Sequence, residues 1–163
     1  MKKRPLSIWF LLIAFGGSCG THIYHLARHQ NSTDYFILSQ NGLGFWFFVL
    51  FFTIALLDFL TFQFIRHGNA HAVKIGTIDI ILSVAQTIWV FILSLGDLDA
   101  TKQAYAANRA ARGFPVRLEA LDAIFSPPYI IGVLTLSTGF TLFVLVLLIA
   151  KRHHFNNGIV EGH

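Results

Sequence analysis

Four long apolar stretches alternate with more polar connections along the chain. Each has roughly the 20 residues that a helix needs to cross a hydrocarbon core of about 30 Å. They cover residues 6–27, 45–65, 75–95 and 129–150. Lipid offers the backbone no hydrogen-bond partners, and strands here would leave open edges, so each stretch has to be helical. The pattern predicts an all-α fold, an antiparallel four-helix membrane bundle that forms one domain over residues 1–163.

The composition sets the environment of this bundle. Apolar residues make up 55% of the 163 residues and charged residues 12%, with a mean hydropathy of +0.62. Soluble domains carry roughly 25% charged residues. A soluble globular enzyme, a disordered chain and a nucleic-acid-binding domain are therefore excluded, and the lipid bilayer is the expected partner.

Lysine and arginine residues predict the orientation. Seven lie on the side of the two termini: Lys2, Lys3, Arg4, Arg66, Lys74, Lys151 and Arg152. Five lie on the other side: Arg28, Lys102, Arg109, Arg112 and Arg117. Most of these five belong to a long loop, where basic residues count less, and acidic residues on that side match them. The positive-inside rule places both termini in the cytoplasm, and we expect the bacterial inner membrane.

The connection over residues 96–128 is long enough to hold structure of its own. Asp99 can cap a helix over residues 100–112, which would end at Gly113. Pro115 suits the first turn of a second helix. The apolar face of that second helix would consist of Leu118, Leu121 and Phe125. We therefore expect a helical outer loop.

Two carboxylic acids, Asp58 and Asp79, lie inside predicted spans. All other Asp, Glu, Lys and Arg residues lie outside them. An ionisable residue costs roughly 2.5–3.5 kcal/mol at the centre of a membrane helix. The two lie at similar depth in neighbouring helices, so they could share a proton and serve proton coupling, cation binding or acid–base chemistry. The simpler alternative is that each bonds to polar neighbours or reaches toward Arg66 or Lys74.

Three histidines share one face of the first span. His22, His25 and His29 have the spacing i, i+3, i+7, so their imidazoles could share a metal ion. Carboxylates that could complete the site are Asp34, Asp97 and Asp99. The alternative is an amphipathic interfacial face. We expect no cofactor: a haem held by two histidines needs a facing histidine, and the other three spans contain none.

Small residues in the first span favour close helix packing. Gly16 and Gly20 form a GxxxG pair, which lets helices approach within a bundle or between subunits. Cys19 is the single cysteine, which excludes an internal disulfide and a cysteine-based zinc site. Residues 16–19 also resemble a lipoprotein signal. The apolar run continues past Cys19, however, and this favours a span over cleavage.

The outer loop carries a group of basic residues. Arg109, Arg112 and Arg117, with Tyr105, could bind an anionic headgroup or a partner. The alternative is a solvated face that acidic neighbours partly neutralise.

The chain resembles small bacterial inner-membrane proteins of unknown function that form four-span bundles. Three segments carry the resemblance: Arg4-Pro5-Leu6-Ser7-Ile8-Trp9 at the start, Arg66-His67 to Lys74 after the second span, and Lys151-Arg152-His153-His154-Phe155 at the end. The resemblance implies the topology and supplies no activity.

Three functions remain open on the sequence. The first is a non-enzymatic accessory subunit or self-associating bundle, with a homo-oligomer or a larger membrane complex as its assembly. The second is a proton- or cation-coupled carrier that uses Asp58 and Asp79. The third is a metal-dependent membrane enzyme that uses His22 and His25.

Overall fold

The computed structural model describes residues 4–156, and every regular element in this part of the chain is a helix. The elements are α1 (Leu6–Ala27), the 3-10 turn η1 (His29–Asn31), α2 (Thr33–Gln40), α3 (Gly44–Arg66), α4 (His71–Gly96), α5 (Leu98–Ala111), α6 (Leu118–Ile124), α7 (Pro127–Ala150) and α8 (Arg152–Asn156). The four long ones, α1, α3, α4 and α7, are long and apolar enough to cross a membrane.

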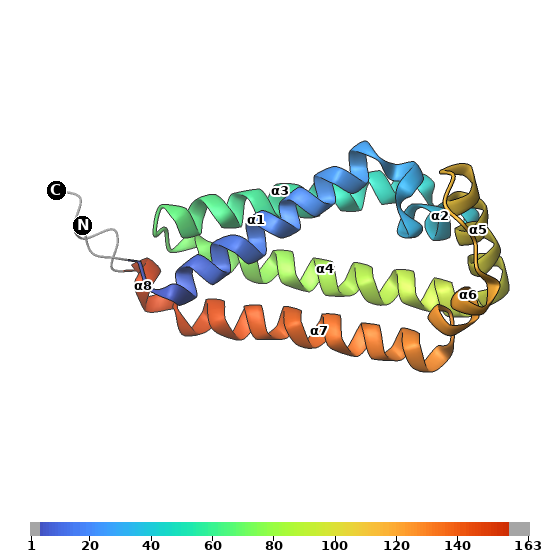
Figure 1. Ribbon diagram of the computed structural model, residues 1–163. Coiled ribbons are helices and arrows are strands. Elements are labelled where there is room, and N and C mark those ends of the chain that lie inside the picture. The colour runs from blue at the N-terminus through green and yellow to red at the C-terminus, as the bar shows by residue number, and fades with distance from the viewer. Residues whose placement is uncertain (1–3, 157–163) are drawn as a thin grey trace.

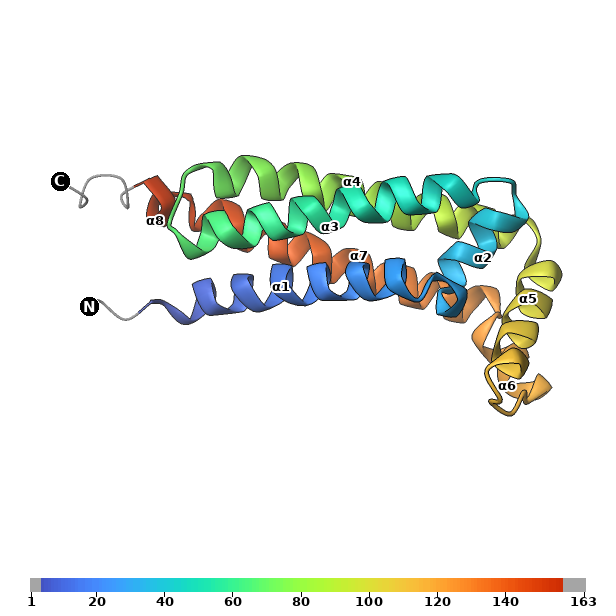
Figure 2. The same ribbon diagram turned by 90° about the horizontal axis from the view of Figure 1, so that it is seen from above.

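These four helices pack side by side in an antiparallel bundle (Figure 1). The start of α1 and the end of α7 lie at one end, which we call the terminal end. The short helices α2, α5 and α6 gather at the opposite end, the loop end, as the view from above also shows (Figure 2). The predicted all-α four-helix bundle is confirmed, and its spans agree with the observed helices to within a few residues.

The long connection between α4 and α7 is helical, as expected, but its first helix begins earlier than predicted. Asp97, not Asp99, is the N-cap: its Oδ1 accepts a hydrogen bond of 2.9 Å from the backbone N–H of Ala100. Asp97 suits this role because its φ of −148° lies outside the helical region. The helix is followed by Gly113, whose φ of +74° few other residues adopt.

Two short helices were not predicted. α2 has 8 residues, too few to show a clear helical period in the sequence, and it packs on α3, α4 and α5 at the loop end. α8 follows the end of α7 directly. The helix expected after Pro115 starts at Leu118, and it buries Leu121 together with its C-cap residue, Phe125.

Apolar side chains form two separate cores. The terminal core consists of Ile8, Leu11, Leu12, Phe15, Ile65, Ala72, Ile80, Val144, Leu148 and Phe155. The loop-end core consists of Ile37, Leu38, Phe47, Phe51 and Val90. All four long helices contribute to the terminal core, whereas α1 and α7 supply no buried residue to the loop-end core. The two cores leave the polar residues of the bundle between and beside them.

Candidate functional site

Asp58 and Asp79 face the interior of the bundle. Asp58 on α3 is 2% exposed and Asp79 on α4 is 1% exposed. Both line one cavity of about 220 Å³, which α1 and α7 close from the other side. The two helices form a hairpin through the turn at Gly68, so the carboxyls that lie at similar depth in sequence also share this space. We call it the central cavity.

His22 of α1 bonds to Asp58 across the helix interface. Its Nδ1 lies 3.0 Å from Asp58 Oδ2 and 2.9 Å from the backbone oxygen of Ser18. A carbonyl oxygen can only accept a hydrogen bond, so this arrangement assigns a proton to Nδ1, which then donates to both oxygens. A bond between an imidazole and a carboxylate is stronger than a bond between two neutral groups. The pair joins α1 to α3 at the centre of the apolar bundle.

Asp79 has one carboxyl oxygen that is not used in a hydrogen bond among the described residues. Its Oδ1 is fully buried and has no hydrogen-bond partner among the described residues, and the same holds for Oγ1 of Thr61 on α3. A buried polar atom without a partner costs about 1–3 kcal/mol. Such an atom in a cavity that also holds His22 and Asp58 indicates a place for a proton or for a bound ion.

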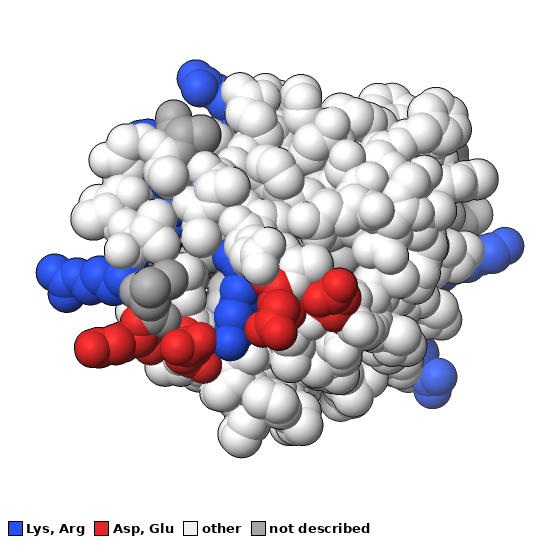
Figure 3. Space-filling view, turned by 90° about the vertical axis from the view of Figure 1, so that its right-hand side faces the viewer, with Lys and Arg blue, Asp and Glu red and all other residues white. Residues whose placement is uncertain are grey.

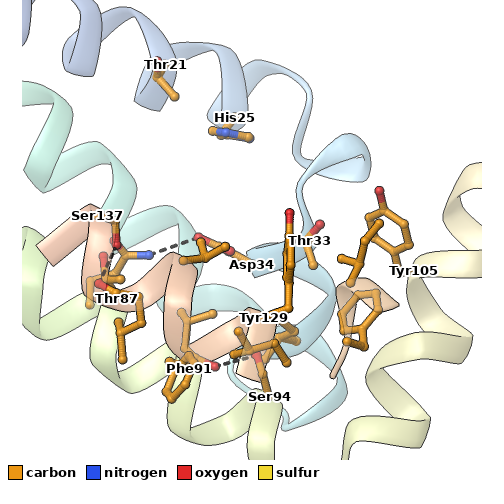
Figure 4. Close-up of a pocket in the computed structure, with 18 of the residues that line it drawn as sticks. Thr21, His25, Thr33, Asp34, Thr87, Phe91, Ser94, Tyr105, Tyr129 and Ser137 are labelled. Atoms are coloured by element: carbon orange, nitrogen blue, oxygen red, sulfur yellow. Dashed lines mark hydrogen bonds between the residues drawn. The ribbon is translucent and has the colours of Figure 1, made fainter. Parts of the chain in front are cut away.

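A second, larger cavity of about 480 Å³ lies toward the loop end; we call it the loop-end cavity. Asp34 of α2 and His25 of α1 point into it (Figure 4). The dashed line to Asp34 marks the bond that Gln86 Nε2 of α4 donates to its Oδ2 over 3.2 Å. Burial raises the pKa of the Asp34 carboxyl, while the nearby His25 and the Gln86 bond act in the opposite direction. His25 Nδ1 is buried and has no partner among the described residues.

The two cavities are neighbours. His22 of α1 and Gln86 and Thr87 of α4 line both of them. Polar side chains therefore follow one another from Asp34, through Gln86 and His22, to the carboxyls of the central cavity.

The three histidines of α1 do not meet at one point. His22 bonds to Asp58, while the His25 ring lies 6.0 Å from the ring of Phe51. The ring of His29 lies 4.8 Å from Tyr35 and 5.2 Å from Phe48. Within residues 4–156, no group of three His, Cys, Asp or Glu side chains is arranged to hold a metal ion. The predicted helical spacing is present, but each imidazole has separate neighbours.

The two glycines of the GxxxG pair have different surroundings. A Cβ at Gly16 would lie 3.4 Å from the ring of Phe62 on α3, whereas a Cβ at Gly20 would meet nothing described within 4 Å. Gly16 thus serves packing inside the bundle, and Gly20 lies on an exposed face of α1. Cys19, between them, is buried, with its Sγ 3.5 Å from the backbone oxygen of Ala55.

The arginine residues of the outer loop contact Phe114 or line a small cavity, and Arg109 does both. Arg109 and Arg112 each lie over the ring of Phe114, at 5.6 and 5.4 Å from its centre. Arg109 and Arg117 line a cavity of about 290 Å³ between α5 and α6. Seen from the loop end, acidic side chains lie beside the basic ones and much of the face is uncharged (Figure 3). Basic and acidic side chains therefore share this face of the molecule.

Two of the important contacts could not be found from the sequence. The bond between His22 and Asp58 depends on where α1 lies along α3. α1 ends beside the second turn of α3 and not beside Gly44: the ring of His25 lies near Phe51, and that of His29, just after α1, lies near Phe48. The bond between Gln86 and Asp34 depends on α2, which was not predicted.

The comparisons with known proteins add no further identification: no family, no curated protein and no solved structure is found to match the chain.

Proposed function

We propose that the chain is a proton- or cation-coupled membrane carrier whose coupling ion is held by His22, Asp58 and Asp79. The observation that carries the proposal is the bond of 3.0 Å between His22 and Asp58, in a cavity that also contains the unpartnered Oδ1 of Asp79. Ionisable residues are expensive inside a membrane, and where they occur together inside a bundle they mark ion or proton pathways.

The surroundings of the three residues support this role. On the loop-end side the central cavity adjoins the larger cavity through His22, Gln86 and Thr87. On the other side the terminal core closes the bundle with residues from all four long helices. A site with space on one side and dense packing on the other is the arrangement expected of a carrier in one of its two states.

We further propose that the chain lies in a bacterial inner membrane with the terminal end in the cytoplasm, as in the small four-span proteins that it resembles. The excess of lysine and arginine near the start of α1, the turn between α3 and α4 and the end of α7 supports this orientation. The loop-end cavity would then face the outer half of the bilayer.

Self-association is a second candidate property. Gly17 and Gly20 leave an exposed, smooth strip on α1, and α7 buries only Val144 and Leu148 among its described residues. Small exposed residues let a helix of a second copy approach closely. Gly20→Leu should therefore weaken a homo-oligomer seen by native mass spectrometry from mild detergent; a wild-type protein that is monomeric at all concentrations would rule this out.

The carrier is tested in vesicles that contain the purified full-length chain and hold an inside-acid pH gradient. Na⁺, K⁺ or ethidium is added outside in turn, and an internal pH dye reports proton efflux. We expect at least one cation to discharge the gradient. Asp58→Asn and Asp79→Asn should each abolish that discharge, because neither amide can exchange a proton.

The control variant is Glu119→Gln, which removes an acidic group from the exposed side of α6 and should discharge the gradient at the wild-type rate. Thermal unfolding in detergent establishes that the Asn variants are folded. Discharge by both Asn variants at the wild-type rate, or no discharge by any of the three cations, contradicts the proposal.

A further inference from the structure

The loop-end cavity has the size and the walls of a site for an organic molecule. Its volume of about 480 Å³ lies within the range of about 300–1,000 Å³ that small-molecule sites have. Aromatic side chains from α3, α4, α5, α7 and the end of α6 surround it: Phe51, Phe91, Tyr105, Tyr129 and Phe125. Neither the proton nor a small cation of the central cavity needs so much apolar wall.

The charge of the lining is one-sided. Asp34 is the single carboxylate among the described lining residues, and no lysine or arginine joins it. The other titratable groups that face the cavity are His22 and His25 from α1, Tyr105 from α5 and Tyr129 from α7. With the histidines neutral, an ionised Asp34 gives the site a net negative charge, which favours a cation.

The cavity opens between two membrane-spanning helices. α1 and α7 meet toward the terminal end, where the ring of Phe10 lies 6.2 Å from Phe140 and 5.7 Å from Phe143. Toward the loop end they diverge (Figure 1). The lining residues there include exposed ones from both helices: Thr21 from α1 and Tyr129, Val133 and Ser137 from α7. Since both helices lie in the bilayer, a molecule dissolved in lipid can reach the cavity from the side.

We propose that the loop-end cavity binds a monovalent organic cation with an aromatic or apolar body, which enters from the lipid between α1 and α7 and has Asp34 as its counter-ion. This inference rests on the proposed carrier function and names the class of its cargo. Aromatic faces attract a cation within about 6 Å of the ring, and the attraction is larger where water is excluded. Asp34, held by Gln86, supplies the opposite charge at one side of the site.

The site also explains how cargo and proton would compete. When Asp34 is protonated, the cavity has no negative charge and the cation loses its counter-ion. Binding of the cation therefore releases a proton from Asp34. His25 and His22 line the same walls, so positive charge on either imidazole would act in the same direction. A variant at Asp34 distinguishes the effect of the carboxyl on cation binding from the effect of the histidines.

The test measures equilibrium dialysis of radiolabelled tetraphenylphosphonium against the full-length chain in mild detergent. We expect saturable binding that weakens about tenfold or more between about pH 8 and about pH 5. Asp34→Asn should weaken binding about tenfold or more at the higher pH, because the cation loses its counter-ion. Asp99→Asn removes an exposed carboxylate at the same end of the molecule and should bind as the wild type does.

A neutral molecule of similar shape, triphenylphosphine oxide, tests whether the positive charge of the ligand is required for binding. It should compete poorly with tetraphenylphosphonium. Equal competition by the neutral molecule, or unchanged binding by an Asp34→Asn variant that unfolds no earlier than the wild type, overturns the proposal. The absence of saturable binding also overturns the proposal. This includes the case in which cross-linking shows that a second copy of the chain covers the mouth between α1 and α7.

Failure of this inference and failure of the carrier are distinguishable. Saturable, Asp34-dependent binding without any cation-driven proton efflux would leave the cation site and remove the carrier. Proton efflux driven by Na⁺ or K⁺ that depends on Asp58 and Asp79, with no binding of tetraphenylphosphonium, would leave the carrier and remove the organic cation.

Discussion

The two halves of the bundle consist of the same four helices and are packed differently. In the terminal half, α4 touches its neighbours closely at Gly76: a Cβ there would lie 2.7 Å from Leu148 Cδ2 on α7 and 2.8 Å from Thr61 Cγ2 on α3. In the loop-end half, α2 packs on α3 and α4, and α1 and α7 line a cavity of about 480 Å³. Apolar composition alone therefore does not decide how tightly these helices pack. Gly76 allows the helices of the terminal half to pack closely. In the loop-end half, the short helix α2 lies beside the cavity.

The difference explains where the polar residues lie. Asp58 and Asp79 are near the border between the halves, and Asp34, His25 and Gln86 belong to the open one. The terminal core offers only apolar neighbours, and three of its members, Phe15, Ile80 and Val144, form part of the apolar wall of the central cavity. Polar chemistry in this molecule thus begins where the close packing ends.

The largest effect is expected from filling the close crossing. Gly76→Leu places a side chain where even its first carbon is too near to Leu148 and Thr61, so the helices have to separate. Overpacking of this kind costs about 3 kcal/mol. Thermal unfolding in detergent should show a clear loss of stability for this variant.

Gly139→Leu on α7 is the matched control, since a Cβ at Gly139 meets nothing described within 4 Å. Its unfolding temperature should stay near that of the wild type. Equal losses at Gly76 and Gly139 would mean that the two halves do not differ in packing as described.

A smaller effect, which depends on pH, is expected in the open half. Burial raises the pKa of Asp34 in the folded chain above the value of about 3.9 in the unfolded chain. The folded state then binds more protons than the unfolded state, so this carboxyl lowers stability as the pH rises above about 4. Asp34→Asn should therefore unfold at a higher temperature than the wild type, with a difference that grows from acid to neutral pH.

The measurement is the unfolding temperature of both proteins over that pH range, with Asp99→Asn to account for the loss of one negative charge. A difference between Asp34→Asn and the wild type that stays constant with pH would show that Asp34 is well solvated, and the cavity would be wetter than its lining indicates.

The smallest effect is expected at the surface of the loop end. Lys102 Nζ lies 2.8 Å from Asp122 Oδ1, and this hydrogen bond raises the pKa of Lys102. The contribution is complete below the pKa of the unfolded lysine, about 10.4, and is lost only at higher pH. Exposed pairs contribute little. Lys102→Ala should leave the unfolding temperature unchanged within error at neutral pH; a marked loss would indicate that the contact between α5 and α6 supports the open half.

The bundle could be predicted well because lipid offers the backbone no hydrogen-bond partners. Apolar segments of spanning length therefore have to be helices, and their bounds follow from where polar residues begin. The sequence also predicted that Asp58 and Asp79 would lie at similar depth, since a short turn joins their helices. The cap of α5 was misplaced by two residues, because Asp97 and Asp99 are equally good caps by type and only the backbone conformation distinguishes them.

The contacts between helices that are far apart in the sequence could not be predicted from the sequence. Nothing in the spacing of His22 indicates that it meets Asp58, because the offset of α1 along α3 depends on packing, such as Gly16 against Phe62. The role of Asp34 depended on α2, whose 8 residues mix polar and apolar types without a clear period. Helical periodicity identifies the face on which a residue lies, and packing decides which partner that face meets.

The partition between the two cavities has a mechanical consequence. It consists of His22 from α1 and Gln86 and Thr87 from α4, and both helices pack mainly against α3. The partition is therefore only one side chain thick and is not locked by a tight interface of its own. Rotation of the Gln86 amide away from Asp34 would remove one part of this partition, so only side chains separate the charge of Asp34 from His22 and Asp58.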